Sequence, residues 1–455
     1  MIAVSIGITW IAALLLCLAD GRRKWVGWTA VGAIGAALVV LATLTPRALD
    51  GDPAQTIAGG WPEGVGITLR ADALGLVFAL VSALVLMIAL AHQVLRGIES
   101  RAFPAVVLFM ATGLTGLFLT GDIFSFFVFF ELSMIASYVL TGYGGRTREI
   151  RGAFVFAVIN LMGSFIFLIG VAALYHVTGT LDMVQISQRI SDVDPGATVL
   201  IAVSFLIAFG VKLGLFPFHF WLPLVYTAAR PAVVAMLAGA LTNIGSYGLL
   251  RFGVEILPRE LQMASTALMV LGAATVLYGG LQAISCRSTS EMLAFSSIGQ
   301  VGYVLLALGI GGPVGIAAAV LYAVVNSLNK LLLFLSIGAR GWLVGAAVLV
   351  GAFSVAGVPP SSGFLAKLAV IDAAVVEGSV AIVVLIVAGS ALSFIYMFQT
   401  FQKDHWEDAP APTAHRTLAE QAMVGLVACL VLVLGLWPEP LLLASAEGAA
   451  ALGLR

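Results

Sequence analysis

Long apolar runs separated by short polar segments recur along the whole chain. A helix of about 20 apolar residues matches the thickness of a bilayer, and it satisfies its own backbone polar groups in lipid. We count about fourteen such runs, and they lie near 3–19, 25–45, 72–92, 104–120, 122–142, 152–175, 197–226, 231–251, 262–284, 291–310, 313–338, 342–376, 379–401 and 420–437. The pattern therefore predicts an all-α polytopic membrane protein with about fourteen transmembrane helices.

Two connections between these runs are long. The first, Pro46 to Ala71, carries Gly-Gly and Trp-Pro between short alternating stretches, which is typical of a small hairpin. The second, His176 to Pro195, has the pattern of an amphipathic helix that lies on a membrane surface. We expect both segments to lie outside the bilayer.

The composition agrees with a lipid environment. Of the 455 residues, 61% are hydrophobic and 10% are charged, whereas about 25% of a soluble domain is charged. The mean hydropathy is +1.09. A formal net charge of −1 leaves no basic face for nucleic acid. The bilayer is therefore an expected partner of the chain, and nucleic acid is not.

The sequence predicts no cofactor and no metal. Its three cysteines, Cys17, Cys286 and Cys429, lie far apart and match no metal-binding spacing. It contains no Walker loop for a nucleotide phosphate and no ligand set for haem or an iron–sulfur cluster. We interpret the cysteines as small apolar residues.

Positive charges indicate the orientation of the chain. Of its 22 Lys and Arg residues, about thirteen lie in loops after odd-numbered runs, about six lie on the opposite side, and three lie inside runs. The first run is expected to be a span, because no positive segment precedes it. Cytoplasmic loops carry the excess of positive charge, so both termini are predicted to lie outside, in a multi-pass protein of the cell (inner) membrane.

Two segments combine a lysine with helix-breaking prolines inside an apolar run. In GVKLGLFPFHFWLP, Lys212 precedes Pro217 by five residues, and in VPPSSGFLAKL, Lys367 follows Pro360 by seven. The order is mirrored and the two runs are five spans apart, which indicates an inverted repeat with paired broken helices. We therefore predict broken seventh and twelfth helices.

The repeat divides the chain into four parts. They are three N-terminal spans with an external hairpin (1–103), a first inverted repeat of spans four to eight (104–251), a second of spans nine to thirteen (262–402), and the last span with a C-terminal tail (403–455). Paired broken helices usually mark a transport site.

Few ionisable residues lie deep in the apolar runs. They are Glu131, Lys212, Lys330, Lys367 and Asp372. Burial disfavours the charged form of such groups and an opposite charge restores it, so a row of them linked by water can pass protons stepwise. A Glu131–Lys212 pair would act as a switch in such a row.

Each of these residues also has a simpler interpretation. Glu131 with Lys212 could be a static salt bridge, Lys330 could reach an interface with its long side chain, and Asp372 could lie near the membrane surface. His219, beside Pro217, could carry protons or hydrogen-bond the carbonyls that the break frees.

Several motifs resemble one family over nearly the whole chain. The chain is similar to the antiporter-like membrane subunits shared by respiratory complex I, membrane-bound hydrogenases and multisubunit Mrp-type Na+/H+ antiporters. The motifs are TGDIFSFFVFFELSMIASYVLTGY, VKLGLFPFHFWLP, LAGALTNIGSYGLLR, EMLAFSSIGQVGYVLLALG, NKLLLFLSIG and GVPPSSGFLAKL. The stretch GGWPEGVGITLRADALG most resembles the D-type subunit of the Mrp antiporters.

This resemblance implies a fold of fourteen helices with two inverted five-helix repeats, and it implies roles for five residues. Glu131 matches the glutamate of the fifth span, and Lys212 matches its lysine partner in the broken seventh. Lys330 matches the central lysine of the eleventh span, Lys367 the outlet lysine of the broken twelfth, and His219 the histidine of the PFH motif. The implied partners are other membrane subunits of a hetero-oligomeric antiporter complex, protons and possibly Na+.

The chain departs from the family pattern at three places. Asn243 occupies a position where the family usually has lysine. Asn326 lies near a position where the family commonly has histidine, and Ser290 or Glu291 occupies a position where the family often has a basic residue. An asparagine side chain can bind water, but it holds no proton at neutral pH. Water would have to bridge these positions, or the chain would conduct poorly.

Three functions fit the sequence. The first is a proton-translocating subunit of a cation/proton antiporter, which is a transporter subunit rather than an enzyme. The second is a proton-pumping subunit of a hydrogenase-like, complex I-like or inorganic-carbon-uptake complex, which would make it part of a redox-driven translocase in some of these assemblies. The third is a non-conducting structural subunit.

Overall fold

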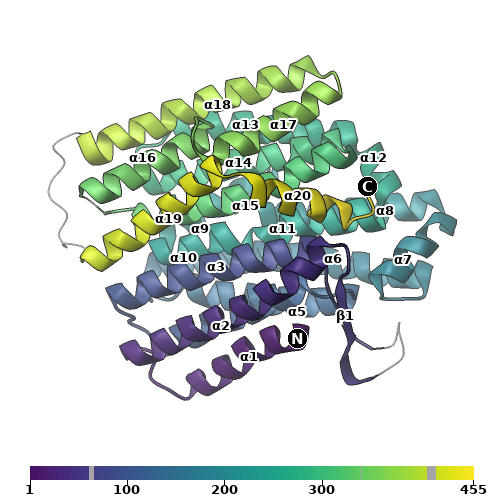
Figure 1. The fold of residues 1–455 in the computed structure, drawn as a ribbon, viewed down its shortest axis with the longest axis horizontal. Helices are drawn as coiled ribbons and strands as arrows, with labels where there is room; N and C mark the ends of the chain where they lie inside the picture. The colour runs from purple at the N-terminus through teal and green to yellow at the C-terminus, as the bar shows by residue number, and fades with distance from the viewer. Residues whose placement is uncertain (61–65, 340, 407–416, 455) are drawn as a thin grey trace.

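The computed structural model describes residues 1–60, 66–339, 341–406 and 417–454, and within them the chain is a bundle of long helices (Figure 1). The helices of the first half are α1 (Ile2–Cys17), α2 (Lys24–Leu49), α3 (Ala73–Arg96), α4 (Phe103–Phe118), α5 (Ile123–Thr141), α6 (Thr147–Thr178), α7 (Met183–Arg189), α8 (Pro195–Leu213), α9 (Trp221–Ala228), α10 (Pro231–Met236) and α11 (Asn243–Gly248).

The second half continues the bundle. Its helices are α12 (Pro258–Met263), α13 (Ser265–Ser285), α14 (Thr289–Ile310), α15 (Gly312–Ser336), α16 (Trp342–Ala356), α17 (Ser362–Val376), α18 (Val380–Phe401), α19 (Leu418–Leu436) and α20 (Glu439–Ala450). Short 3₁₀ segments are η1 (Ala58–Gly60), η2 (Ile190–Asp192) and η3 (Phe218–Phe220), and π-helical segments are η4 (Leu237–Leu241), η5 (Leu249–Ile256) and η6 (Gln402–Trp406).

Eleven of the described helical segments are long and apolar enough to cross a membrane. Three shorter apolar helices, α1, α4 and α16, lie where further spans are predicted. The predicted all-α class is therefore confirmed for the described residues, apart from one small sheet. The count of fourteen crossings and the inverted repeat remain predictions.

The predicted hairpin is present in the described residues. Strand β1 (Ala54–Ile57) pairs antiparallel with β2 (Thr68–Ala71), so that Ala54 faces Ala71. The predicted amphipathic segment contains α7, which buries Met183 and Ile186 beneath a polar outer side. The Gly-Gly and Trp-Pro dipeptides of the first segment and the helical period of α7 made both elements visible in the sequence.

Both predicted helix breaks are also present. Helix α8 ends at Leu213, and α9 begins at Trp221. The predicted span 342–376 is two helices, α16 and α17, separated at residues 357–361. Each first half-helix ends in a glycine with positive φ, Gly214 (64°) and Gly357 (80°), a backbone conformation that residues with a Cβ rarely adopt.

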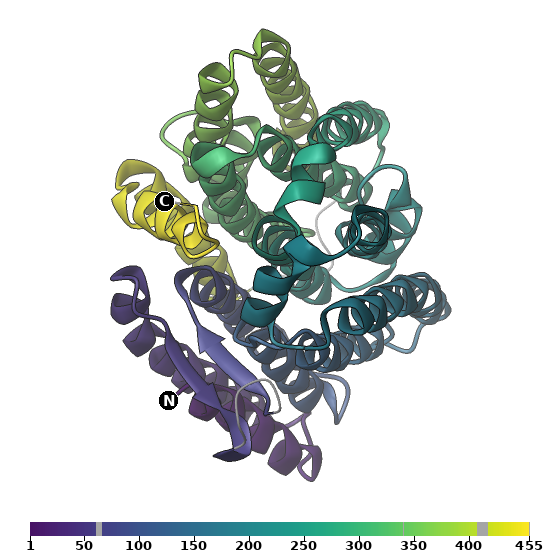
Figure 2. The ribbon, with the colours of Figure 1, turned by 90° about the vertical axis from the view of Figure 1, so that its right-hand side faces the viewer.

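The most buried helices lie at the centre of the bundle. The most apolar stretches of 231–256 and 312–336 are fully buried, whereas outer helices such as α19 expose apolar side chains. Helix α15 packs against α3, α14, α17 and α20. Figure 2 shows α19 and α20 between the N-terminal helices and the second half. A buried charge in α15 therefore lies far from the outer surface that lipid would cover.

Candidate functional site

Three lysines inside the bundle form the candidate site. Lys212, Lys330 and Lys367 are only 4%, 6% and 3% exposed, and they come from α8, α15 and α17. An ammonium group at membrane depth is unfavourable by several kcal/mol unless protein groups or water replace its hydration. The contacts of each lysine therefore show how the bundle tolerates it.

Lys212 is held by helix α6. Its Nζ donates to the Asn160 carbonyl oxygen at 2.8 Å and to Ser164 Oγ at 3.1 Å, and it lies 4.4 Å from the centre of the Phe130 ring. A cavity of about 10 Å³ adjoins it, lined in part by Asn160 and Thr242, and this volume is about that of one water site. The first lysine therefore binds a different helix from its own.

Glu131 follows Phe130 on α5, but it does not touch the lysine in this structure. Its Oε1 is buried, and no hydrogen-bond partner for it exists among the described residues. The same residues contain no ion pair between Glu131 and Lys212. A static salt bridge is therefore not what holds Lys212, and a longer-range role for Glu131 remains a prediction.

Asn243 connects the two halves of the molecule. Its Nδ2 donates to Ser82 Oγ at 3.1 Å and to the Gly239 carbonyl at 3.2 Å, and its Oδ1 accepts from Ser327 Oγ at 2.9 Å. The residue lies between the π-helical segments η4 and η5, and such segments are frequent at functional sites. Ser327 is one helical turn before Lys330 in α15.

Lys330 lies within the fully buried α15. No hydrogen bond or ion pair of its ammonium group is found in the described parts of the chain. It lines a cavity of about 10 Å³ whose other polar lining residues are Ser296, Ser297, Gln300, Asn326 and Asn329. Space for about one water beside an otherwise unpartnered ammonium group favours hydration of this lysine. Its position inside the bundle does not favour the alternative that it reaches an interface.

A hydrogen-bonded network extends from this cavity. Gln300 Oε1 accepts from Tyr322 at 2.5 Å, and Gln300 Nε2 donates to Tyr396 at 3.3 Å. The Tyr396 hydroxyl also lies 3.0 Å from Ser296 Oγ and donates to Ser393 Oγ at 3.1 Å. These residues were not predicted as site residues. Ser296 and Gln300 lie in the motif EMLAFSSIGQVGYVLLALG, but an uncharged polar side chain in an apolar helix does not reveal its partners on other helices.

Lys367 lies beside this network and meets it through aromatic rings, not through a hydrogen bond. Its Nζ donates to the Ala356 carbonyl at 3.3 Å and lies 4.9 Å from the centre of the Tyr303 ring. The Tyr303 ring stacks on Tyr322 with centroids 5.0 Å apart. A Cβ on Gly357 would approach Lys367 Cδ to 2.6 Å, so this glycine also leaves room for the side chain.

His219 and Asp372 lie apart from the three lysines. His219 packs on Tyr278 with ring centroids 4.3 Å apart, and its Nδ1 is buried without a hydrogen-bond partner among the described residues. The carbonyl of Val211 at the break is bonded by Trp221 Nε1 at 3.0 Å, not by His219. Asp372 is exposed on the bundle, and its position near the membrane surface stays a prediction.

A buried cluster of four charges was not foreseen. Arg251 Nη2 lies 2.8 Å from Asp72 and its Nη1 2.6 Å from Glu255, while Arg70 Nη1 lies 2.8 Å from Glu255. These bonds tie β2 and the start of α3 to η5. Arg251 is 3% exposed, and the orientation of the chain in the membrane stays a prediction. The described residues contain no group of three or more His, Cys, Asp or Glu that could hold a metal.

Comparison with known proteins decides the family. The family model described as NADH:quinone oxidoreductase/Mrp antiporter, TM matches residues 120–341. The D-type subunit of the Na(+)/H(+) antiporter of Alkalihalophilus pseudofirmus is 34% identical over 412 residues, which cover 84% of this chain and 83% of that protein. This chain belongs to the antiporter-like membrane subunits of that family. It is therefore a multi-pass membrane protein.

Solved structures agree with this assignment over the whole length. A subunit of the Mrp complex from Dietzia sp. DQ12-45-1b superimposes with a TM-score of 0.90 at 27% identity, covering 99% of this chain and 97% of that one. A subunit of the membrane-bound sulfane sulfur reductase, described as an archaeal respiratory membrane complex, gives a TM-score of 0.91 at 25% identity, with coverages of 99% and 97%. Antiporter-like subunits of both assemblies thus share this fold.

Proposed function

We propose that this chain is a proton-translocating subunit of a multisubunit cation/proton (Na+/H+) antiporter complex. The observation that carries the proposal is the set of three buried lysines, two of them with water-sized polar cavities at their sides. Buried ammonium groups without carboxylate partners are poor stabilisers of a fold, so their presence on three central helices favours a functional role. The relative from the Na(+)/H(+) antiporter of Alkalihalophilus pseudofirmus supports the antiporter assignment.

The proposed path runs through the centre of the bundle. A proton reaches Lys212 through the first repeat, 104–251, and crosses to Lys330 by way of water near Asn243 and Ser327. The Gln300 network and its cavity then connect Lys330 to Lys367 and an outlet half-channel in the second repeat, 262–402. Asparagine and serine side chains can orient water in this path, although neither holds a proton at neutral pH.

Glu131 acts in this proposal as an electrostatic switch. Its Oε1 is buried without a hydrogen bond among the described residues, and the ammonium group of Lys212 lies over the ring of the preceding residue, Phe130. A shift of α5 or α8 that brings the two groups together would favour the charged form of Lys212, and their separation would favour proton release towards Lys330.

The proposed partners, transported ions and membrane orientation are based on the relatives and on the charge pattern of the sequence. The partners are other membrane subunits of a hetero-oligomeric complex, and the transported ions are protons and possibly Na+. The chain lies in the cell (inner) membrane with both termini outside, and segments 1–103 and 403–455 flank the two repeats. It is a transporter subunit, not an enzyme by itself.

One observation supports an alternative function. The subunits of the sulfane sulfur reductase and of the Mrp complex superimpose on this chain equally well, so the same fold would also serve as a proton-pumping subunit of a redox-driven complex. Asn243 and Asn326, in turn, favour a non-conducting structural subunit. Identification of the chains that copurify with this protein separates the first two alternatives.

Lys330→Ala tests conduction directly. Because Lys330 is the central buried lysine, its loss should abolish Na+-dependent proton movement into vesicles that contain the purified complex, while the complex still assembles. Lys24→Ala is the control, since Lys24 is exposed. Wild-type exchange in an assembled Lys330→Ala complex would leave this chain a structural subunit.

A further inference from the structure

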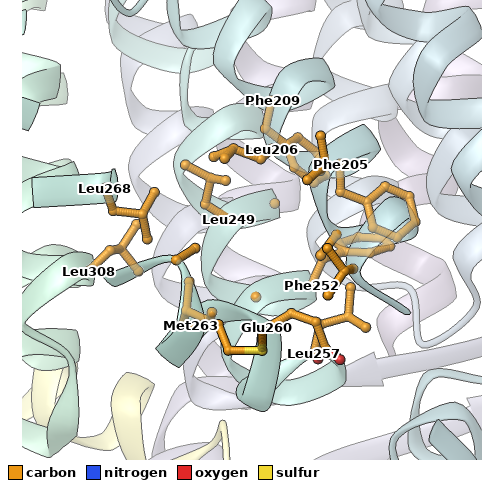
Figure 3. Close-up of a pocket in the computed structure, with 17 residues that line it drawn as sticks. Phe205, Leu206, Phe209, Leu249, Phe252, Leu257, Glu260, Met263, Leu268 and Leu308 are labelled. Carbon is orange, nitrogen blue, oxygen red and sulfur yellow. The ribbon is translucent and has the colours of Figure 1, made fainter. Parts of the chain in front are cut away.

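A cavity of about 260 Å³ lies between α8, η5, α12 and α13, far larger than the spaces of about 10 Å³ beside Lys212 and Lys330. Its walls include the side chains of Phe205, Leu249, Phe252, Met263, Leu268 and Leu308, which surround an open centre in Figure 3. The proposed proton path does not use this space.

The walls of the cavity are apolar. Of the 17 residues that line it, Glu260 alone has a polar side chain, and the Thr198 hydroxyl already donates to that carboxylate. A buried water needs two to four polar partners, which these walls do not supply. An empty space of this size would forfeit packing energy in a close-packed interior. The chemistry of the walls therefore calls for an apolar occupant.

The cavity opens towards the outer surface of the bundle. Two of its wall residues, Val203 and Met263, are 46% and 73% exposed, and the neighbouring Leu200 on α8 is 71% exposed. On a multi-pass membrane protein, such outward apolar side chains face lipid. The inner wall is closed, because Leu268 and Leu308 are 1% and 2% exposed. An occupant can thus enter from the bilayer and end deep in the protein.

We propose that this cavity binds one acyl chain of a bilayer phospholipid. An acyl chain in lipid is already in an apolar medium, so the gain on entering the cavity is packing against the aromatic walls. Arg259 is exposed and precedes Glu260 in α12, which places a cation near the headgroup.

An acyl chain in this cavity would contact the helix that carries Lys212, the first half of the first broken span. Phe205 and Phe209 line the cavity from α8, and both pack on Phe252 of η5, with ring centroids 4.8 and 5.4 Å apart. Phe209 is three residues before Lys212. A bound acyl chain supports these rings from the lipid side and so steadies the end of α8 that carries the lysine.

A photoreactive lipid tests the proposal. The purified complex is reconstituted in vesicles of phosphatidylethanolamine and phosphatidylglycerol that contain a phosphatidylglycerol with a diazirine near the end of one acyl chain. After irradiation, labelled peptides are identified by mass spectrometry. We expect label on the peptides that contain Leu268 and Leu308, which lipid lying on the surface cannot reach. Phe154 on α6, 69% exposed, reports ordinary contact with lipid.

Two variants fill the space from opposite walls. Ala202→Phe and Ala264→Phe should each abolish the label on Leu268 and Leu308 and leave the label on Phe154 unchanged. Leu200→Phe adds the same ring to α8 outside the cavity, and it should leave all labelling unchanged. Retained label at Phe154 shows that a variant is still folded in the membrane.

Three outcomes would overturn the proposal. The first is label on Phe154 without label on the deep wall, as expected if a neighbouring subunit covers the cavity. The second is deep label that both filling variants leave intact. The third is deep label from a diazirine free fatty acid but none from the phospholipid, which would assign the site to a soluble apolar ligand. The readout is independent of ion exchange, so it does not depend on the proposed function.

Discussion

Lys212 and Lys367 lie on opposite sides of their helix breaks, and the ammonium group of Lys367 bonds to the C-terminus of a first half-helix whereas that of Lys212 bonds to α6. Lys212 is in the last turn of α8, before Gly214. Lys367 is in α17 and reaches back to the carbonyl of Ala356, the last residue of α16. The C-terminus of a helix carries partial negative charge, so the end of α16 stabilises the ammonium group of Lys367 directly.

The two lysines differ in what else holds them. Lys212 bonds to Asn160 and Ser164 of α6, a separate helix, so a relative shift of α6 and α8 changes its contacts. The contact of Lys367 with Ala356 lies within its own broken span, and Gly357 makes room for the side chain. We infer that the first break is the adjustable one and that the second is a fixed outlet.

Removal of either lysine should have the largest effect. Lys212→Ala and Lys367→Ala should each abolish Na+/H+ exchange in vesicles while the complex assembles. The arginine variants sharpen the comparison, because arginine does not release its proton in proteins. Lys212→Arg should be inactive, because Lys212 must release its proton towards Lys330, whereas Lys367→Arg should retain part of the exchange, because the fixed outlet keeps its positive charge. Equal activity of the two arginine variants would mean that the breaks do not differ in this way.

Glu131 should matter through its charge. Glu131→Gln keeps the size of the side chain and removes the charge, so it should lose nearly all exchange, and Glu131→Asp should retain some. Exchange is measured against the extent of assembly of each variant. Near-normal exchange in Glu131→Gln would show that Glu131 is not an electrostatic switch. The contacts of Lys212 with Asn160 and Ser164 would then have to control its proton.

The first break should be weakened by loss of an indole N–H. Trp221→Phe keeps an aromatic ring but removes one of the two donors to the Val211 carbonyl, which still accepts from the Gly214 amide at 3.2 Å, and the loss of one hydrogen bond reduces stability by about 0.5–1.5 kcal/mol. The unfolding temperature of the purified protein should fall accordingly. Trp437→Phe is the control, since Trp437 is 62% exposed. An equal change in both variants would show that the indole contact does not stabilise the break.

Asn243→Lys should have the smallest effect. The structure places this position between the halves, among Ser82, Ser327 and Gly239, and a lysine there would add a proton-binding group to the path. Exchange should stay the same or increase. An assembled variant that loses all exchange would show that Asn243 is more than a position of the proton path that water bridges. It would refute the path through this position.

The helix breaks could be predicted because proline and glycine act locally, and the lysines because charge in an apolar run is conspicuous. The partners of Lys212 could not, since Asn160 and Ser164 are ordinary polar residues of an apolar helix until α6 and α8 pack together. The same holds for Gln300 and Tyr322. Their roles depend on contacts between helices, and the sequence pattern of a single helix does not predict such contacts.

The central claim is that the first break is adjustable and the second is fixed. The accessibility of the two breaks to a small water-soluble thiol reagent tests it most directly. Ser164→Cys places a thiol beside Lys212, and Ser354→Cys places one beside the second break, where Ser354 Oγ accepts from the Gly363 amide. Both are made in a chain without Cys17, Cys286 and Cys429.

The account predicts that an imposed Na+ gradient changes the rate of labelling in the Ser164→Cys variant and leaves the rate in the Ser354→Cys variant constant. A gradient-dependent rate at the second break with a constant rate at the first, or the same change at both, would contradict it.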